Sequence, residues 1–330
     1  MSFLYCTADR IASCTGGGVV TQNEMTALLD LAVEVKQRFN CWGRDELAGP
    51  GDDPWKWDEQ ALVNCEKRIF APPVDLAHFY SGTFSRTVER LKKNGCKIAY
   101  TCAAHDIELS RAEHEKLGIP YAYPHLNEPE LWQRYVAGYL AAHVVVCPSQ
   151  HSAAVVRKQG CRRVEIIPHG CELPEQVAPL PKQFTVGYLG AIGPDKGLIY
   201  LLQAWKELDY KDATLIIAGR ESTSPFLLQL INHFGGGIIQ LTGWIKNVAD
   251  FYNSISLYIQ PSVTEGFGIE VLEAMASGRP VLCSTGAGAA DLVAEGHWTF
   301  PAKDVTELSK AIDNFKRAPG DWLSDVGYQN

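Results

Sequence analysis

Residues 264–281, TEGFGIEVLEAMASGRPV, place two turn glycines before the expected start of a helix, with Glu265 ahead of the helix and Glu273 inside it. The glycines let the backbone approach a ligand closely. The amides of Gly268 and Ile269 would open the helix, where the helix dipole favours an anion. Glu265 before the helix and Glu273 within it could accept hydrogen bonds from ligand hydroxyls. The pattern therefore predicts a site for an anionic ligand with hydroxyls. The alternative is an amphipathic helix with solvated glutamates and a capping glycine.

The elements that must position these residues are short strands separated by helix-length segments. A 3.6-residue spacing of apolar side chains predicts helices at 20–39, 130–142 and 198–207. Strands that alternate with helices indicate βαβ units, parallel sheets and an α/β fold. The expected strands are Phe3–Cys6, Lys97–Cys102, His143–Cys147, Val164–Ile167, Thr185–Leu189, Ala213–Ala218, Ile238–Leu241, Leu257–Gln260 and Pro280–Cys283.

The chain is long enough for two domains, since its 330 residues exceed the size of most single domains. Residues 171–183, CELPEQVAPLPKQ, contain three prolines and no periodic pattern, which predicts a linker. We therefore predict an N-terminal domain at 1–177 and a C-terminal domain at 178–330. Residues 41–57, rich in Gly, Pro, Asp and Trp, are either a functional loop or a surface excursion held by buried tryptophans.

Composition excludes several classes of protein. The net charge of −8, from 30 basic and 38 acidic residues, disfavours non-specific binding of nucleic acid. The ten cysteines include no C-x-x-C pair and lie in apolar runs, which favours free buried thiols in a reducing compartment. No apolar stretch reaches ~18 residues, and the first residues lack the basic segment of a signal peptide. We therefore expect a cytoplasmic protein.

The glycine–glutamate string resembles a known signature. Residues 264–281 resemble the Glu-x7-Glu motif of retaining GT-B glycosyltransferases, specifically glycosyltransferase family four. Residues 186–198, VGYLGAIGPDKGL, look like the first strand and loop of that family's C-terminal domain, and 214–219, TLIIAG, like the next strand. A weaker likeness covers IIPHG at 166–170 and GGGV at 16–19.

The resemblance implies a GT-B architecture, in which two Rossmann-like parallel-sheet domains face each other across a cleft. The N-terminal domain would bind the acceptor and the C-terminal domain the nucleotide-sugar donor, with a last helix that could pack back on the N-terminal domain. The implied activity is that of a retaining hexosyltransferase. It would move a hexose from a GDP- or UDP-linked donor to a hydroxyl of a glycan, lipid-linked or other acceptor.

The resemblance also implies roles for particular side chains. Lys196 should neutralise the pyrophosphate, Glu265 should hold hydroxyls of the donor sugar, and His105 should touch the same sugar. Glu273 should bind the ribose. His105 ends the apolar run 99–104, and the ends of parallel strands are where α/β sites form.

Backbone groups should contribute most of the remaining donor contacts. Trp244 and Ile245 lie where this family reads the nucleotide base, although Trp244 is equally compatible with a core position. The other positions expected to bind the donor are Gly17, Gly18, Gly190, Gly266, Phe267, Gly268 and Ile269.

One position departs from the family. Many members carry an Arg about five residues before the lysine, and here that residue is Ala191. A lost charge-assisted hydrogen bond would cost about 1.5–3 kcal/mol, so donor binding should be weaker unless another cation substitutes. Arg220 is the candidate, against the alternative of an exposed loop arginine. No Asp-x-Asp occurs, so we expect transfer without a metal or a cofactor.

Two other readings stay open. The first is a GT-B nucleotide-sugar epimerase or phosphorylase, which would share the fold and the phosphate site. The second is a catalytically weak nucleotide-sugar-binding partner, which Ala191 keeps open. The basic segment 81–97 is compatible with peripheral membrane contact or, more simply, with a solvated face.

Overall fold

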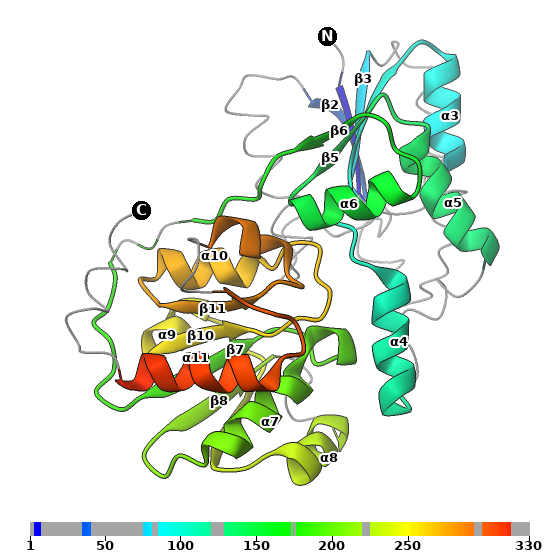
Figure 1. Cartoon of the computed structure of the whole chain (residues 1–330). Helices are drawn as coiled ribbons and strands as arrows, with labels where there is room; N and C mark the ends of the chain where they lie inside the picture. The colour runs from blue at the N-terminus through cyan, green and yellow to red at the C-terminus, as the bar shows by residue number, and fades with distance from the viewer. Residues whose placement is uncertain are drawn as a thin grey trace. The chain divides into compact units, whose positions relative to one another are not determined.

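The computed structural model contains two six-stranded parallel sheets, one in each of two units (Figure 1). One unit consists of residues 1–104 and 122–169, and the other of residues 105–121 and 170–330. The residues that the structure describes are 3–7, 35–40, 75–80, 85–119, 129–172, 174, 176–219, 225–293 and 299–317.

The sheet of the first unit has the strand order β2-β1-β3-β4-β5-β6. Its strands are β1 (Phe3–Thr7), β2 (Val35–Asn40), β3 (Leu76–Tyr80), β4 (Lys97–Thr101), β5 (Val144–Cys147) and β6 (Val164–Ile166). The described helices of this unit are α3 (Ser85–Lys93), α5 (Pro129–Leu140) and α6 (Gln150–Lys158). Parallel strands need crossover connections, which these helices provide.

Aromatic side chains form the centre of the first unit's core. Phe79 stacks on Tyr100 with ring centroids 5.9 Å apart, and Tyr100 meets Tyr139 edge to face at 6.3 Å. The thiols of Cys102 and Cys147 are buried in the same cluster, and burial raises the pKa of each to about 12. Thiols with such a pKa are inert near neutral pH.

The N-terminal region contains one error of the sequence analysis and one omission. The expected helix 20–39 is wrong over its last residues, because Val35–Asn40 forms the strand β2. This strand is polar, VKQRFN, and lies at the edge of the sheet, so it lacks the apolar run that marks a buried strand. Strand β3, LAHFY, was not predicted at all, although its Ala77 and Phe79 are fully buried.

The sheet of the second unit has the order β12-β11-β10-β7-β8-β9, in which the winding direction reverses between β7 and β10. This is the doubly wound order of dinucleotide-binding folds. The strands are β7 (Thr185–Leu189), β8 (Thr214–Ala218), β9 (Ile238–Gly243), β10 (Leu257–Gln260), β11 (Val281–Ser284) and β12 (Thr299–Phe300). The first five match the expected strands to within two residues at each end.

Helices cover this sheet, and helices and strands together supply its buried core. They are α7 (Leu198–Leu208), α8 (Pro225–Phe234), α9 (Val248–Ser254), α10 (Ile269–Ala276) and α11 (Val305–Arg317), together with the 3-10 turns η2 (Pro194–Lys196) and η3 (Gly288–Leu292). Helix α7 contacts both α8 and α11 (Figure 1). It buries Leu201, Leu202 and Trp205 completely. The expected helix at 198–207 is thus confirmed.

One helix of the second unit comes from the N-terminal half of the sequence. Helix α4 (Ile107–Leu117) follows strand β4 of the first sheet, yet residues 105–121 group with the second unit. The Asp106 side chain caps the helix by accepting a hydrogen bond from the Leu109 amide, and Gly118 ends it in the left-handed conformation, with φ 66°. The domain division at residue 177 stays a prediction.

Among the described residues, no helix is both long and apolar enough to cross a lipid bilayer.

Candidate functional site

Two loops of the second unit meet where the strand order reverses. Residues 190–197 follow β7, and residues 261–268 follow β10. The backbone carbonyl of Asp195 accepts hydrogen bonds from the amides of Val263, at 2.7 Å, and Thr264, at 3.3 Å. In open α/β sheets, ligands bind outside the carboxyl ends of the strands at such a reversal. The fold therefore brings the two loops that the sequence analysis singled out to one place.

Glycine at position 197 is what allows the two loops to touch. Gly197 has φ 69°, which most side chains avoid, and an added Cβ would lie 2.0 Å from the carbonyl oxygen of Pro261. Contact this close excludes every other residue. The residue before this glycine is Lys196, so the close approach also delivers the lysine to the second loop.

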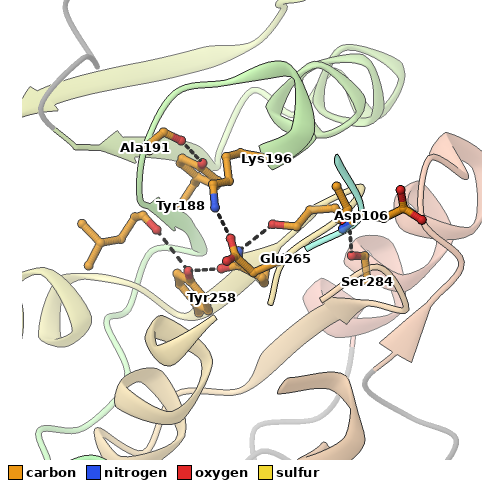
Figure 2. A network of polar contacts seen from close by, with 11 residues as sticks. Asp106, Tyr188, Ala191, Lys196, Tyr258, Glu265 and Ser284 are labelled. Atoms are coloured by element: carbon orange, nitrogen blue, oxygen red, sulfur yellow. Dashed lines mark hydrogen bonds and ion pairs between the residues drawn. The ribbon is translucent and has the colours of Figure 1, made fainter. Parts of the chain in front are cut away.

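Lys196 and Glu265 form an ion pair across the two loops, with Lys196 Nζ donating to Glu265 Oε2 (Figure 2). Burial alone would raise the pKa of Glu265, but the charge and hydrogen bond of Lys196 outweigh burial and lower it. Burial likewise opposes the charge of Lys196, but Glu265 and Asp195 outweigh it and raise the lysine pKa. Both groups are therefore charged at neutral pH, in a site where each side chain is about one-fifth exposed.

A third carboxyl, Glu270, adjoins this pair and was not predicted. It is the second residue of α10, and a methyl group placed on Gly190 would lie 3.9 Å from its Oε1 atom. Burial, followed by the negative charge of Glu265, raises the pKa of Glu270 to about 7. Lys196 thus faces several carboxyl groups, and Glu270 is the one whose pKa rises to about 7.

Glu273 lies one turn further along α10 and is bound by a buried tyrosine. The Tyr252 hydroxyl lies 2.9 Å from Glu273 Oε2 and 3.1 Å from the Glu270 carbonyl oxygen, so it can donate to either. Burial raises the pKa of Glu273, and the hydrogen bond from Tyr252 partly offsets the rise. The two glutamates of the Glu-x7-Glu motif therefore differ, because only Glu265 has a cationic partner among the residues described.

Two tyrosines on neighbouring strands support the loops. The Tyr188 hydroxyl donates to the carbonyl of Ala191 at 2.5 Å, which holds the start of the first loop (Figure 2). The Tyr258 hydroxyl lies 2.6 Å from Gln260 Oε1 and 3.2 Å from the Leu189 carbonyl oxygen. Neither tyrosine was predicted from the sequence, although Tyr188 lies one residue before the carboxyl end of β7, which was a usable signal.

The second loop is also tied to the strand beside it. Gln260 Nε2 donates to Ser262 Oγ at 2.8 Å, and the Ser284 hydroxyl on β11 donates to the Ser262 carbonyl. These three side chains are buried. Because each polar group has a partner, the loop that carries Glu265 is held in one conformation.

His105 lies in the same unit as the ion pair. The amide of the next residue, Asp106, donates to the Thr264 hydroxyl at 2.9 Å, and Thr264 directly precedes Glu265 (Figure 2). A positive charge on His105 lowers the pKa of Glu265, in addition to the larger effect of Lys196 that overcomes burial. The structure therefore brings together Lys196, Glu265 and His105, which the sequence places far apart.

The start of α10 has the backbone that the sequence analysis expected. Gly268 is the residue before the helix and has φ 94°, and none of the described side chains caps this end by a hydrogen bond. Phe267 is buried in the core beneath, and Ile269 packs partly against it. The helix N-terminus thus points its positive dipole end toward the loop that carries Glu265.

The remaining predicted positions are more scattered. Trp244 is half exposed, which argues against the alternative that it is simple core, whereas Ile245 packs on the core. Ala191 is exposed. Gly17, Gly18 and Arg220, together with the unassigned segment 41–57, lie outside the described residues.

Sequence comparison identifies the class of the second unit. Residues 183–316 match the family model of glycosyl transferases group 1. These residues include both loops of the site. The match ends one residue before the end of α11.

Curated relatives of the chain include glycosyltransferases named for capsular polysaccharide and for lipopolysaccharide. The capsular polysaccharide biosynthesis glycosyltransferase CapM of Staphylococcus aureus is 31% identical over 131 residues, covering 37% of this chain and 33% of the relative. The lipopolysaccharide 1,2-N-acetylglucosaminetransferase of Salmonella typhimurium is 28% identical over 202 residues, covering 54% and 53%. The chain thus spans from a third to just over a half of the length of these relatives.

Solved structures share the fold over nearly the whole chain. Sucrose-phosphate synthase of Thermosynechococcus elongatus has a TM-score of 0.78 at 16% identity, and the alignment covers 99% of this chain and 92% of the synthase chain. HepE of Anabaena, in complex with UDP and glucose, has a TM-score of 0.65 at 17% identity and covers 100% and 95%. The fold expected from the sequence, an α/β fold of the GT-B type with parallel sheets, is confirmed.

Proposed function

We propose that this chain transfers a hexose from a nucleotide diphosphate sugar to a hydroxyl acceptor, with retention at the anomeric carbon and without a metal ion. The observation that carries the proposal is the Lys196–Glu265 ion pair at the strand-order reversal of the glycosyl transferases group 1 domain. The pair provides a carboxylate for sugar hydroxyls and a cation for the diphosphate.

Each charged group has a separate role in the proposed transfer. Glu265, kept ionised by Lys196, accepts hydrogen bonds from hydroxyls of the donor sugar. Lys196, kept protonated, stabilises the negative charge that develops on the leaving diphosphate, and the α10 dipole adds to this effect. Glu273 binds the ribose, and Trp244 and Ile245 lie beside the base.

The transfer itself proceeds on one face of the sugar. The acceptor oxygen forms a bond to the anomeric carbon while the bond from that carbon to the diphosphate oxygen breaks. The proton of the acceptor hydroxyl goes to the departing phosphate. Glu265 has the hydroxyl-binding role, so no covalent intermediate is required, and retention follows from attack on the face from which the diphosphate leaves.

Turnover of GDP- and UDP-linked hexoses by two variants tests the proposal. We expect Lys196→Ala and Glu265→Ala to fold and to lose transfer by 100-fold or more, because each removes an interaction with charge or hydroxyls in the transition state. Lys310→Ala is the matched control, since Lys310 pairs with Glu307 on the exposed face of α11. Full activity in both site variants would overturn the proposal.

Product analysis tests the finer parts. The anomeric configuration of the product, read by NMR, should equal that of the donor, and a chelator should leave the rate unchanged. A product that forms without any acceptor would instead indicate an epimerase.

One observation favours the second candidate, a nucleotide-sugar-binding partner with weak catalysis. The position of the family's arginine holds the exposed Ala191, and the carboxyl of Glu270 lies near the adjacent Gly190. Both features lower the positive potential where a diphosphate would lie. Donor binding without transfer across a panel of acceptors would favour this candidate.

A further inference from the structure

Helix α4 is held to the second unit by a buried carboxylate that the mechanism does not use. Glu113 is 4% exposed. Its Oε2 atom accepts a hydrogen bond from the Tyr200 hydroxyl on α7 at 2.6 Å, and its Oε1 atom pairs with Lys303 Nζ at 3.0 Å. Lys116 Nζ in turn donates to the Tyr200 hydroxyl at 3.0 Å. We call these four side chains the Glu113 clamp.

Attaching a helix through a buried carboxylate carries a desolvation penalty. Burying a carboxylate costs several kcal/mol, and the attraction of a partner ion only partly offsets this cost. Apolar residues of the same volume often stabilise the folded protein as well or better. Lys303 also takes the left-handed backbone conformation, with φ 69°, although it is not a glycine. Strained backbone of this kind persists only where its surroundings impose it. Directional contacts therefore fix how α4 lies, in addition to keeping it attached.

The other end of α4 is tied to the candidate site. The Asp106 amide donates to Thr264, the neighbour of Glu265, and α4 packs against η2, which ends at Lys196. Asp106 and Glu113 are separated by about 10 Å along the helix axis at 1.5 Å per residue. One hydrogen bond at Asp106 would let the helix pivot, whereas the clamp provides a second fixed point two turns away.

We propose that Glu113 is a positioning residue that, through the clamp, holds the start of α4 and with it His105 against the Lys196–Glu265 pair. This inference rests on the proposed function of that pair. A displacement of about 1 Å at a reacting centre can reduce a rate 100-fold, so a clamp two turns from the site is enough to matter for catalysis.

The test is a double-mutant cycle between Glu113 and His105, read in kcat for hexose transfer. We expect Glu113→Ala to lower kcat at least tenfold. In the otherwise wild-type protein, His105→Ala should lower kcat strongly. In the Glu113→Ala background, the same substitution should lower kcat by less than about threefold further. Glu113→Gln should recover part of the rate, since its amide oxygen still accepts one hydrogen bond. Glu115→Ala, on the exposed side of the same helix, is the matched control and should have no effect.

A measurement without substrate separates this inference from the proposed function. The imidazole NMR signals of His105 should shift in Glu113→Ala and remain in place in Glu115→Ala. Tyr200→Phe, which removes one hydrogen bond and keeps the ring, replaces Glu113→Ala if that variant does not fold. Unmoved signals, or additive effects in the cycle, would overturn the clamp as a positioning device. If the wild type showed no turnover but the His105 signals shifted in Glu113→Ala, only the proposed function would be overturned.

Discussion

Lys196, Glu265 and Glu270 share one partly buried site, and their mutual charges decide which of them is ionised. Lys196 holds the pKa of Glu265 down against burial, whereas burial and the charge of Glu265 together raise the pKa of Glu270 to about 7. The sequence shows three ordinary ionisable residues here. Only their distances in the folded chain separate a carboxylate whose pKa is lowered from a carboxyl that takes up a proton near neutral pH.

Glu270→Gln should make the stability of the protein less dependent on pH. The pKa of Glu270 is higher in the folded chain than the ordinary 4.5, so the folded state binds the extra proton and loses stability as pH rises from 4.5 through 7. The difference in unfolding free energy, variant minus wild type, should therefore be more favourable to the variant at pH 8 than at pH 5, by on the order of 1–2 kcal/mol. Urea unfolding at the two pH values measures this difference. Glu115→Gln on the exposed side of α4 is the control, and a difference equal to that control would contradict the assignment.

At the scale of the element, the two loops at the strand-order reversal act together because their backbones are in direct contact. The Asp195 carbonyl binds two amides of the second loop, and Gly197 allows the approach to Pro261. Helix α4 adds a third element through Asp106 and Thr264. The residues that the resemblance assigned to one site are therefore placed by contacts among three separate segments.

Gly197→Ala should separate the loops. Its Cβ would lie 2.0 Å from the Pro261 carbonyl oxygen in a left-handed conformation, and we expect a loss of about 2–4 kcal/mol of unfolding free energy together with loss of transfer. Gly118→Ala is the control, because Gly118 has φ 66° but no atom within 4 Å of the added methyl group. That variant should lose only about 1–2 kcal/mol and keep its activity. Equal losses in thermal unfolding would mean that the close approach is unimportant.

At the scale of the whole molecule, each unit contains one parallel sheet, and the second unit takes up a helix from the first half of the chain. The second unit holds every member of the candidate site that the structure describes. Its family match, over residues 183–316, includes both loops at the strand-order reversal, which is where open α/β sheets bind ligands. We therefore expect a bound nucleotide-sugar donor to raise the free energy of unfolding of the chain, whatever the acceptor is.

Thermal unfolding with a panel of nucleoside diphosphates and their sugars should identify the donor. A ligand present at 100 times its Kd adds about 2.7 kcal/mol to the free energy of unfolding. We expect one nucleotide series, GDP- or UDP-linked, to raise the Tm of the wild type and to have a much smaller effect on Lys196→Ala. If no member of the panel raised the Tm at millimolar concentration, the second unit would not be a donor-binding domain.

The fold class, most strands of the second sheet and two of the loops that form the site could be predicted from the amino-acid sequence. This was possible because apolar periodicity and glycine-rich turns are local properties that neighbouring residues encode. The polar edge strand β2 was mistaken for helix for the same reason, since its pairing with β1 is not a local property.

Which charged side chains meet depends on the folded chain. Lys196 and Glu265 are 69 residues apart, and Glu113 and Lys303 are 190 apart, so no local pattern could pair them. The ionisation of Glu270 and the assignment of α4 to the second unit depend on burial and on long-range contacts in the same way. These quantities arise only when the chain brings distant segments together and excludes water from between them.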